Sequence, residues 1–174
     1  ARMAEGTKLV LKLQLVTAQR KGEVAGAEWR DIDLQKGWWT IPAEKTKNGL
    51  SHRIPLSSLS LEILKKAKEY SNNSQWVFPS PHKDQHITEP AIDHAVRNNH
   101  DNFGIDHFTP HDLRRTAASL MTGAGISRLT VGKILNHAES GVTATYDRHS
   151  YDLEKSQSLE TWERKLESIL TGKK

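Results

Sequence analysis

The chain of 174 residues has the length of one domain, a net charge of +4, a pI near 9.3 and no cysteine. Without cysteine it has no disulfide, no thiolate metal site and no cysteine nucleophile, and its modest basic excess permits a polyanionic partner without requiring one. No apolar run approaches the roughly 18 residues that a membrane span needs, and no signal peptide opens the chain, so we expect a cytoplasmic protein without a membrane partner.

Apolar residues at helical spacing predict a buried helix over residues 5–18, then a second, shorter helix within residues 20–34 that carries Val24, Ala27 and Trp29. The pattern next alternates and predicts a β-hairpin from residues 37–47 and 50–57 around an Asn48-Gly49 turn, with a third short strand near Arg30–Asp33. Further helices are expected over residues 58–71, 87–100, 108–120, 126–138, 141–149 and 158–170. The expected fold class is α+β, mainly α, with one small three-stranded antiparallel sheet.

The stretch "FTPHDLRRTAASL", residues 108–120, places three basic side chains at the start of a predicted helix. Thr109 and the proline after it are typical of an N-cap and a first helical position, and Asp112 completes a capping box. His111 then lies in the first turn, where free backbone N–H groups favour an anion, and Arg114 follows on the same face. Arg115 is rotated away and is expected to form an ion pair or a backbone contact. The pattern indicates half of a phosphate clamp, although a solvated basic face also fits it.

Three other segments carry candidate polar residues. Each has an ordinary structural interpretation on its own: an ion pair near a helix end, lysines exposed at a hairpin tip, and a histidine and a tyrosine near two helices. The candidates are Arg20 and Glu23 in "TAQRKGEV", Lys45 and Lys47 in "EKTKNGLSHRIP", and His137 and Tyr146 in "LNHAESGVTATYDRHSY".

In their order and spacing, these segments resemble the catalytic domain of tyrosine recombinases, the phage-integrase family, over about residues 5–150. The family's first box, T-G-x-R-x-x-E/D, is matched by "TAQRKGEV" and implies a catalytic Arg20 with Glu23 as its accessory acid. The second box, H-x-L-R-[RH]-[TS], is matched by "HDLRRT" and implies catalytic roles for His111 and Arg114.

The resemblance also assigns the remaining positions. The family's hairpin lysine precedes a strand that ends in Pro-Leu, which implies Lys47, with Lys45 as the weaker candidate. "LNH" supplies His137, and "TYDRHSY" supplies Tyr146 as the nucleophile; the nearby Tyr151 does not have the family spacing. Two glycines of the family pattern are absent here, because alanine occupies position 18 and asparagine occupies position 136.

The resemblance implies a site-specific recombinase or integrase that cleaves and rejoins DNA through a 3′-phosphotyrosyl intermediate, without metal, ATP or another cofactor. Arg20 and Arg114 would bind the phosphate, His137 would add a hydrogen bond and His111 would accept the proton of Tyr146. Lys47 would protonate the leaving 5′-oxygen.

The same resemblance sets expectations for organisation and partners. Residues 1–174 form a single catalytic domain of a longer recombinase, with a C-terminal helix over about residues 155–174 and the N-terminal DNA-binding domains absent. The implied partner is a double-stranded DNA attachment or core site, on which four copies assemble with weak or no self-association alone. An accessory DNA-bending protein or an excisionase is a further expected partner. The C-terminal helix packs either on its own domain or on a neighbouring copy.

Three alternatives stay open at this stage. A type IB topoisomerase or telomere resolvase shares the chemistry, and a relative that has lost catalysis would only bind DNA. The nine histidines permit a metal enzyme, but His82 and His86 lie in a proline-flanked loop, and His107 and His111 lie on either side of a helix start. Insensitivity of the activity to EDTA would argue against the metal enzyme.

Overall fold

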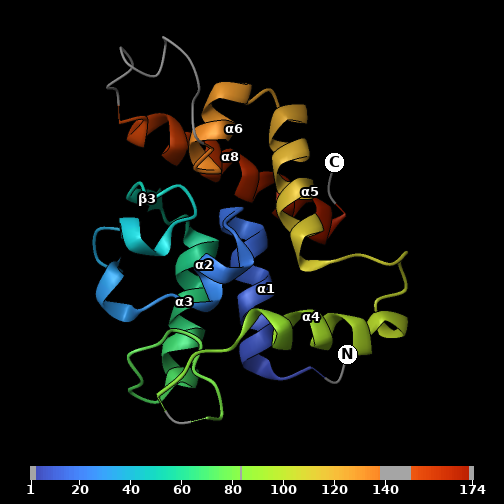
Figure 1. Cartoon of the computed structure of the whole chain (residues 1–174). Coiled ribbons are helices and arrows are strands. Elements are labelled where there is room, and N and C mark those ends of the chain that lie inside the picture. The colour runs from blue at the N-terminus through green and yellow to red at the C-terminus, as the bar shows by residue number, and fades with distance from the viewer. Residues whose placement is uncertain (1–2, 83, 138–149, 173–174) are drawn as a thin grey trace.

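The computed structural model describes residues 3–82, 84–137 and 150–172. Helix α1 (Glu5–Thr17) lies in the middle of the molecule, and α3 (Ser58–Ser71) and α5 (Pro110–Gly123) pack against it (Figure 1). The inward side of α1 carries Leu9, Val10 and Leu13, each of them at most 1% exposed. The helix expected over residues 5–18 is therefore confirmed, as is the helix over residues 58–71.

The second helix is shorter than expected: α2 (Lys21–Ala25) ends before Gly26. The prediction that a helix continues to Trp29 was wrong. Backbone groups of residues 27–29 bond instead to residues 75–77, where Val77 N–H donates to the Ala27 carbonyl at 2.9 Å. This pairing with a distant segment holds the chain extended, and a 3₁₀ turn, η1 (Trp29–Asp31), follows.

The sheet has the antiparallel order β1-β2-β3, from β1 (Ile32–Asp33), β2 (Trp38–Ile41) and β3 (His52–Pro55). The hairpin and its third strand are confirmed, but the expected tight turn at Asn48-Gly49 is not. Pairing ends at Ile41 opposite His52, because Pro42 has no N–H to continue the ladder. Residues 42–51 form a long loop that contains η2 (Ala43–Lys45). This loop reaches the candidate site described below.

The next helices along the chain each begin after a residue that caps them. Helix α4 (Glu89–Asn98) starts after Thr88, whose hydroxyl accepts the Ala91 N–H at 3.4 Å; η3 (His100–Asn102) follows. The capping box of α5 is present, since an Asp112 carboxylate oxygen accepts the Thr109 N–H at 2.9 Å. Helix α6 (Arg128–Ile134) ends just before His137. The helix expected over residues 141–149 lies outside the described residues.

The long helix α8 (Asp152–Thr171) packs on the domain of its own chain. Leu159, Trp162 and Leu166 are buried in the common core, and the indole N–H of Trp162 donates to the Leu15 carbonyl at 3.0 Å. A mainly helical fold with one three-stranded antiparallel sheet is thereby confirmed as the fold class. Among the described residues, no helix combines the length and apolar character needed to cross a bilayer.

Candidate active site

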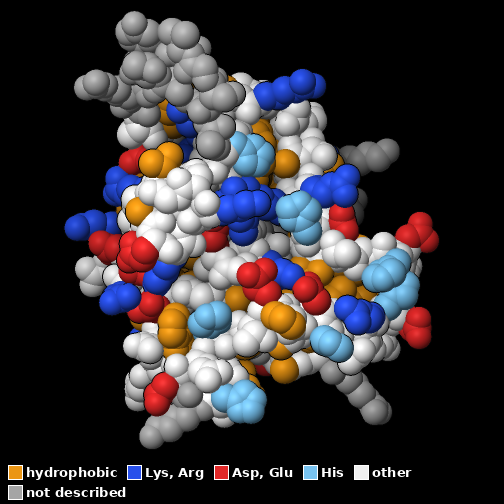
Figure 2. Space-filling model, in the orientation of Figure 1, with side chains coloured by type: hydrophobic (Ala, Val, Ile, Leu, Met, Phe, Trp, Pro, Cys, Tyr) orange, Lys and Arg blue, Asp and Glu red, His pale blue; other side chains and the backbone are white. Residues whose placement is uncertain are grey.

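A pocket of about 660 Å³ lies where α2, the loop 42–51 and the start of α5 meet. We call it the cationic pocket. Figure 2 shows Lys and Arg side chains gathered in the middle of one face of the molecule, with histidines beside them. The pocket is lined by Arg20, Lys21, Gly22, Glu23, Glu44, Lys45, Thr46, Lys47, His86, Glu89 and His111. Five of the candidates from the sequence, from three separate segments, are in this set.

Arg20 caps the start of α2 and is held by Glu23. One oxygen of the Glu23 carboxylate accepts the Arg20 guanidinium N–H at 2.8 Å, and the other accepts its backbone N–H at 3.1 Å. The guanidinium also donates to the Asn136 carbonyl at 3.4 Å. The Glu23 side chain is only 4% exposed, whereas the Arg20 side chain is 26% exposed. The Glu23 carboxylate is therefore buried and bound to Arg20, whereas the Arg20 side chain is exposed enough to line the pocket.

Arg114 lies between the C-terminal ends of two helices. Its guanidinium donates to the Ala18 carbonyl at 2.7 Å, after α1, and to the Leu135 carbonyl at 2.5 Å, after α6. Helix ends leave such carbonyls without intrahelical partners, and the helix dipole there favours a cation. Burial first, and then the positive charge of Arg20, lowers the pKa of Arg114 to about 10, while Glu23 opposes the shift. The guanidinium stays charged at neutral pH.

Two left-handed turns place these carbonyls. Ala18 directly follows α1 and has φ of 56°, and Asn136 lies two residues after the end of α6 and has φ of 49°. Glycine adopts this conformation without penalty and asparagine tolerates it, whereas alanine pays about 1–2 kcal/mol. Ala18 and Asn136, which replace the two family glycines, thus lie in the two turns whose carbonyls bind Arg114 and Arg20. The backbone conformation that glycine would allow is kept at both.

The two hairpin lysines differ in their surroundings. The ammonium of Lys45 lies 2.6 Å from a Glu28 carboxylate oxygen and 2.7 Å from one of Asp31. Lys47 is exposed and lines the cationic pocket together with His111, which stands in the exposed first turn of α5. Since Lys45 is bound to two carboxylates, this arrangement favours Lys47 as the lysine that is available to a ligand.

His137 directly follows the turn that binds both arginines. It is exposed, and its backbone N–H donates to the Gly132 carbonyl at 3.0 Å. Partial burial of its ring, followed by the charges of Arg114 and Arg20, lowers the pKa of His137, which favours the neutral imidazole.

Of the two tyrosines considered as the nucleophile, the structure describes only Tyr151. Tyr146 lies outside the described residues. Its rival Tyr151 precedes α8, and the ammonium of Lys133 sits 4.4 Å from the centre of the Tyr151 ring. Arg115 forms the expected ion pair, with Asp112 at 3.1 Å.

Several polar residues that support the site were not recognised in the sequence. The buried side chains of Gln19 and His52 both bond to the Ile134 carbonyl, each at 2.9 Å, and so hold the C-terminal end of α6. Asn48, in the loop 42–51, and Asn136, in the turn after α6, form a hydrogen-bonded side-chain pair. The Asn-Gly dipeptide indicated only a turn, and nothing local in the sequence connects residues so far apart in the chain.

His52 predicts a specific loss of stability in acid. Burial lowers its pKa to about 4, the nearby charges of Lys155, Arg114 and Arg20 add to this, and the bond to Ile134 opposes it. The unfolded chain takes up a proton below about pH 6.5, but the folded chain does so only below about pH 4, so acid favours unfolding between these values.

The expected contribution of His52 is about 3 kcal/mol of unfolding free energy, lost between about pH 6.5 and pH 4. Urea titrations across this range should show a steeper loss in the wild type than in His52→Gln, whose amide keeps a donor for Ile134. Parallel loss in the two proteins would contradict the assignment.

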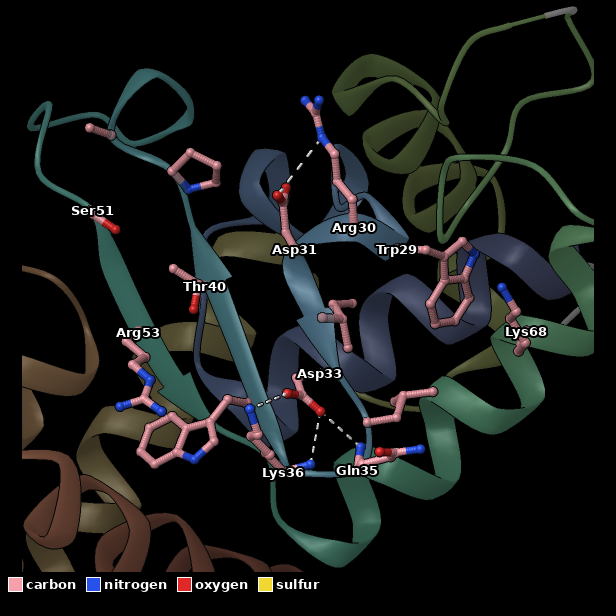
Figure 3. A pocket seen from close by; sticks show the side chains of 15 residues that line it. Trp29, Arg30, Asp31, Asp33, Gln35, Lys36, Thr40, Ser51, Arg53 and Lys68 are labelled. Carbon is pink, nitrogen blue, oxygen red and sulfur yellow. Dashed lines mark hydrogen bonds and ion pairs between the residues drawn. The ribbon is translucent and has the colours of Figure 1, made fainter.

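A larger cavity of about 970 Å³ lies on the outer face of the sheet, away from the nominated residues (Figure 3). Its charged side chains already have partners: the Arg53 guanidinium lies 3.8 Å from the centre of the Trp38 ring, and the Lys68 ammonium lies 4.5 Å from that of Trp29. Asp33 is engaged by its neighbour Lys36 at 3.6 Å. We therefore place the candidate active site in the cationic pocket. No group of three or more His, Asp and Glu side chains suited to a metal ion occurs in the described part of the chain.

Comparison with known proteins agrees with this architecture. The sequence model of the phage integrase family matches residues 2–152. This chain belongs to the phage integrase family. Among curated integrases, it is 28% identical over 165 residues to prophage integrase IntA of Escherichia coli, covering 93% of this chain and 39% of that protein. It is 26% identical over 143 residues to tyrosine recombinase XerA of Pyrococcus furiosus, covering 81% and 49%.

Solved integrase structures share the fold. The integrase from mycobacterium phage Brujita superposes with a TM-score of 0.73 at 20% identity, covering 93% of this chain and 53% of that one. The lambda integrase catalytic core gives 0.63 at 24% identity, covering 79% and 82%. This integrase-family chain thus spans about two fifths to half of the curated relatives named here, and matches most of an isolated catalytic core.

Proposed function

We propose that the chain is the catalytic domain of a site-specific DNA recombinase that cleaves and rejoins strands through a 3′-phosphotyrosyl intermediate. The observation that carries the proposal is the convergence of two arginines on one turn: Leu135 and Asn136, consecutive in the chain, bind Arg114 and Arg20 through their carbonyls. Both guanidinium groups are thereby fixed before any substrate arrives. Fixed donors aimed at a phosphate stabilise the charge that develops on its oxygens in the transition state.

The proposed cleavage step is a balanced transesterification. The Tyr146 phenol oxygen attacks phosphorus and its proton passes to His111, because a phenol with a pKa of about 10 is a weak nucleophile at neutral pH. The bond from phosphorus to the 5′-oxygen breaks, and that oxygen takes a proton from Lys47. One phosphodiester replaces another, so rejoining is the same step in reverse and needs no ATP. Arg20, Arg114 and His137 donate to the non-bridging oxygens throughout.

The proposed partner is double-stranded DNA bearing a core site. The cationic pocket supplies phosphate contacts, so we expect binding to weaken steeply with added salt. We also propose a tetramer on DNA, which would bring two duplexes together for strand exchange, and a phage or genomic-island origin. The match to part of longer integrases supports the view that this domain acts together with DNA-binding domains of a larger protein.

Covalent trapping tests the proposal. The protein is incubated in EDTA with nicked duplexes of randomised core sequence, in which cleavage releases a short strand and prevents rejoining. Adducts recovered from a denaturing gel are sequenced to define the core site. We expect a metal-independent adduct that is absent in Tyr146→Phe, because no phenol oxygen remains to attack phosphorus, and present in the matched variant Tyr151→Phe.

Two results would overturn the assignment. An adduct lost in Tyr151→Phe but kept in Tyr146→Phe would transfer the nucleophile to Tyr151. Binding to DNA without any adduct, in this chain and in a longer protein that contains it, would favour a DNA-binding relative without catalysis.

A further inference from the structure

We propose that the paired amides of Asn48 and Asn136 position Lys47 as the acid that protonates the leaving 5′-oxygen. This inference rests on the proposed function, and it assigns a role to two residues that lie outside the nominated catalytic set. The pair joins the tip of the loop 42–51 to the turn that follows α6.

The pairing between the two side chains is reciprocal. The Asn48 amide N–H donates to the Asn136 side-chain oxygen at 3.0 Å, and the Asn136 amide N–H donates back to the Asn48 oxygen at 3.3 Å. The Asn48 amide also donates to the Asn136 main-chain carbonyl at 3.2 Å. Three hydrogen bonds between two residues 88 positions apart define both the distance and the relative orientation of the loop and the turn.

Within the part of the chain that the structure describes, the pair is the hydrogen-bonded link between the loop tip, residues 46–50, and the rest of the domain. Thr46 donates from its hydroxyl to the Ala43 and Leu50 carbonyls, at 3.0 Å and 2.9 Å, and the Leu50 N–H donates to the Asn48 side chain at 3.2 Å. Among the described residues, the other hydrogen bonds of residues 46–50 stay within the loop in this way. Lys47 is exposed on this tip, and its side chain forms no hydrogen bond or ion pair with another described residue, so its position depends on where the pair holds the loop.

Asn136 is suited to this role by its backbone as well as its side chain. Its φ of 49° is one that asparagine tolerates, so the turn keeps the conformation that glycine would allow. Its carbonyl receives both the Arg20 guanidinium and the Asn48 amide. Glycine at this position would keep the carbonyl and the turn but lose two of the three bonds to the loop. Asn136 therefore holds in place both Arg20, which would bind the phosphate, and the loop that carries Lys47.

The role can be tested through the leaving group. Breaking the bond from phosphorus to the 5′-oxygen would release a strongly basic alkoxide, so that oxygen needs a proton as it leaves. A 5′-bridging sulfur leaves as a thiolate, whose conjugate acid has a pKa of about 8.5 in cysteine, and does not need one. A residue that acts only by positioning the acid should therefore matter for the oxygen substrate and not for the sulfur substrate.

The experiment measures single-turnover cleavage of two nicked duplexes that carry the recovered core site, one with oxygen and one with sulfur at the 5′-bridging position. The variants are Asn48→Ala, Asn136→Gly, the double variant and Lys47→Ala. We expect each single variant to slow cleavage of the oxygen duplex by about 10–100-fold, since small misplacements of a catalytic group have effects of this size. Cleavage of the sulfur duplex should stay near the wild-type rate, as in Lys47→Ala.

The matched control is Asn73→Gly. Asn73 is exposed, has φ of 65° and lies in the turn after α3, outside the pocket lining, so the variant makes the same left-handed asparagine-to-glycine change elsewhere. It should cleave both duplexes like the wild type. The double variant should be no slower than the slower single variant, because both changes remove one interaction.

Each other outcome decides against the inference. Equal slowing on both duplexes would mean that the pair serves folding or DNA binding, and wild-type rates on both would mean that it does not position Lys47. Failure of sulfur to rescue Lys47→Ala would show that Lys47 is not the acid. A wild-type protein that cleaves neither duplex would instead overturn the proposed function itself.

Discussion

Replacement of Arg114 by glutamine is expected to slow covalent DNA cleavage by about 10²–10³-fold at saturating DNA, the usual loss for one fixed donor in an active site. The side chain is 4% exposed and is held by the Ala18 and Leu135 carbonyls, so no neighbouring group can take its place. Arg114→Lys should recover little of the rate, because an ammonium cannot span two carbonyls and a phosphate as a planar guanidinium does.

Arg115→Gln is the matched control for this prediction. Arg115 is the next residue on the same helix, its side chain is 73% exposed, and it pairs with Asp112. Its variant should cleave at a rate close to that of the wild type. Urea denaturation of both variants separates loss of chemistry from loss of fold. If a folded Arg114→Gln protein cleaves DNA at a rate within about tenfold of the wild-type rate, Arg114 is not part of the active site.

Truncation of Trp162 to alanine is expected to lower the free energy of unfolding by about 3–5 kcal/mol. Trp162 is fully buried on α8, where it packs in the core shared with α1, and its indole N–H is bonded to the Leu15 carbonyl. The variant leaves a large cavity and also removes the hydrogen bond to the Leu15 carbonyl. A urea or thermal denaturation curve followed by far-UV circular dichroism measures the change.

Leu170→Ala is the comparison on the same helix, since Leu170 is 77% exposed and its truncation should change stability by no more than about 0.5 kcal/mol. The wild-type transition should not depend on protein concentration, because α8 packs on its own domain. A midpoint that rises with concentration, or equal effects of the two truncations, would indicate that α8 docks on a second copy instead.

Local patterns in the sequence predicted many of the helices and strands correctly. The helix over residues 58–71 has the predicted bounds, and the capping box at Thr109 and Asp112 starts α5 as expected. Both rest on interactions within a few residues: apolar spacing in the first case and side-chain-to-backbone bonds in the second. The second helix was predicted too long because its end depends on pairing with residues 75–77, which local spacing does not contain.

The candidate site divides in the same way. The residue types and their order nominated Arg20, His111, Arg114 and Lys47 without reference to structure, and the family supplied the spacing. The physical reason to prefer Lys47 over Lys45 comes from the tertiary structure, because Glu28 and Asp31 both bind the Lys45 ammonium.

The sequence by itself determined the chemical inventory and the family of this protein, because short motifs with definite spacing are properties of the chain. The tertiary structure alone decided how that inventory is held: Arg114 lies between two helix ends, and the Asn48–Asn136 pair bridges a loop and a turn. These contacts join residues 88 and 96 positions apart, as well as a helix and the turn 21 residues after it. Their geometry follows from how the core packs α1, α5 and α6 together, which no local pattern records.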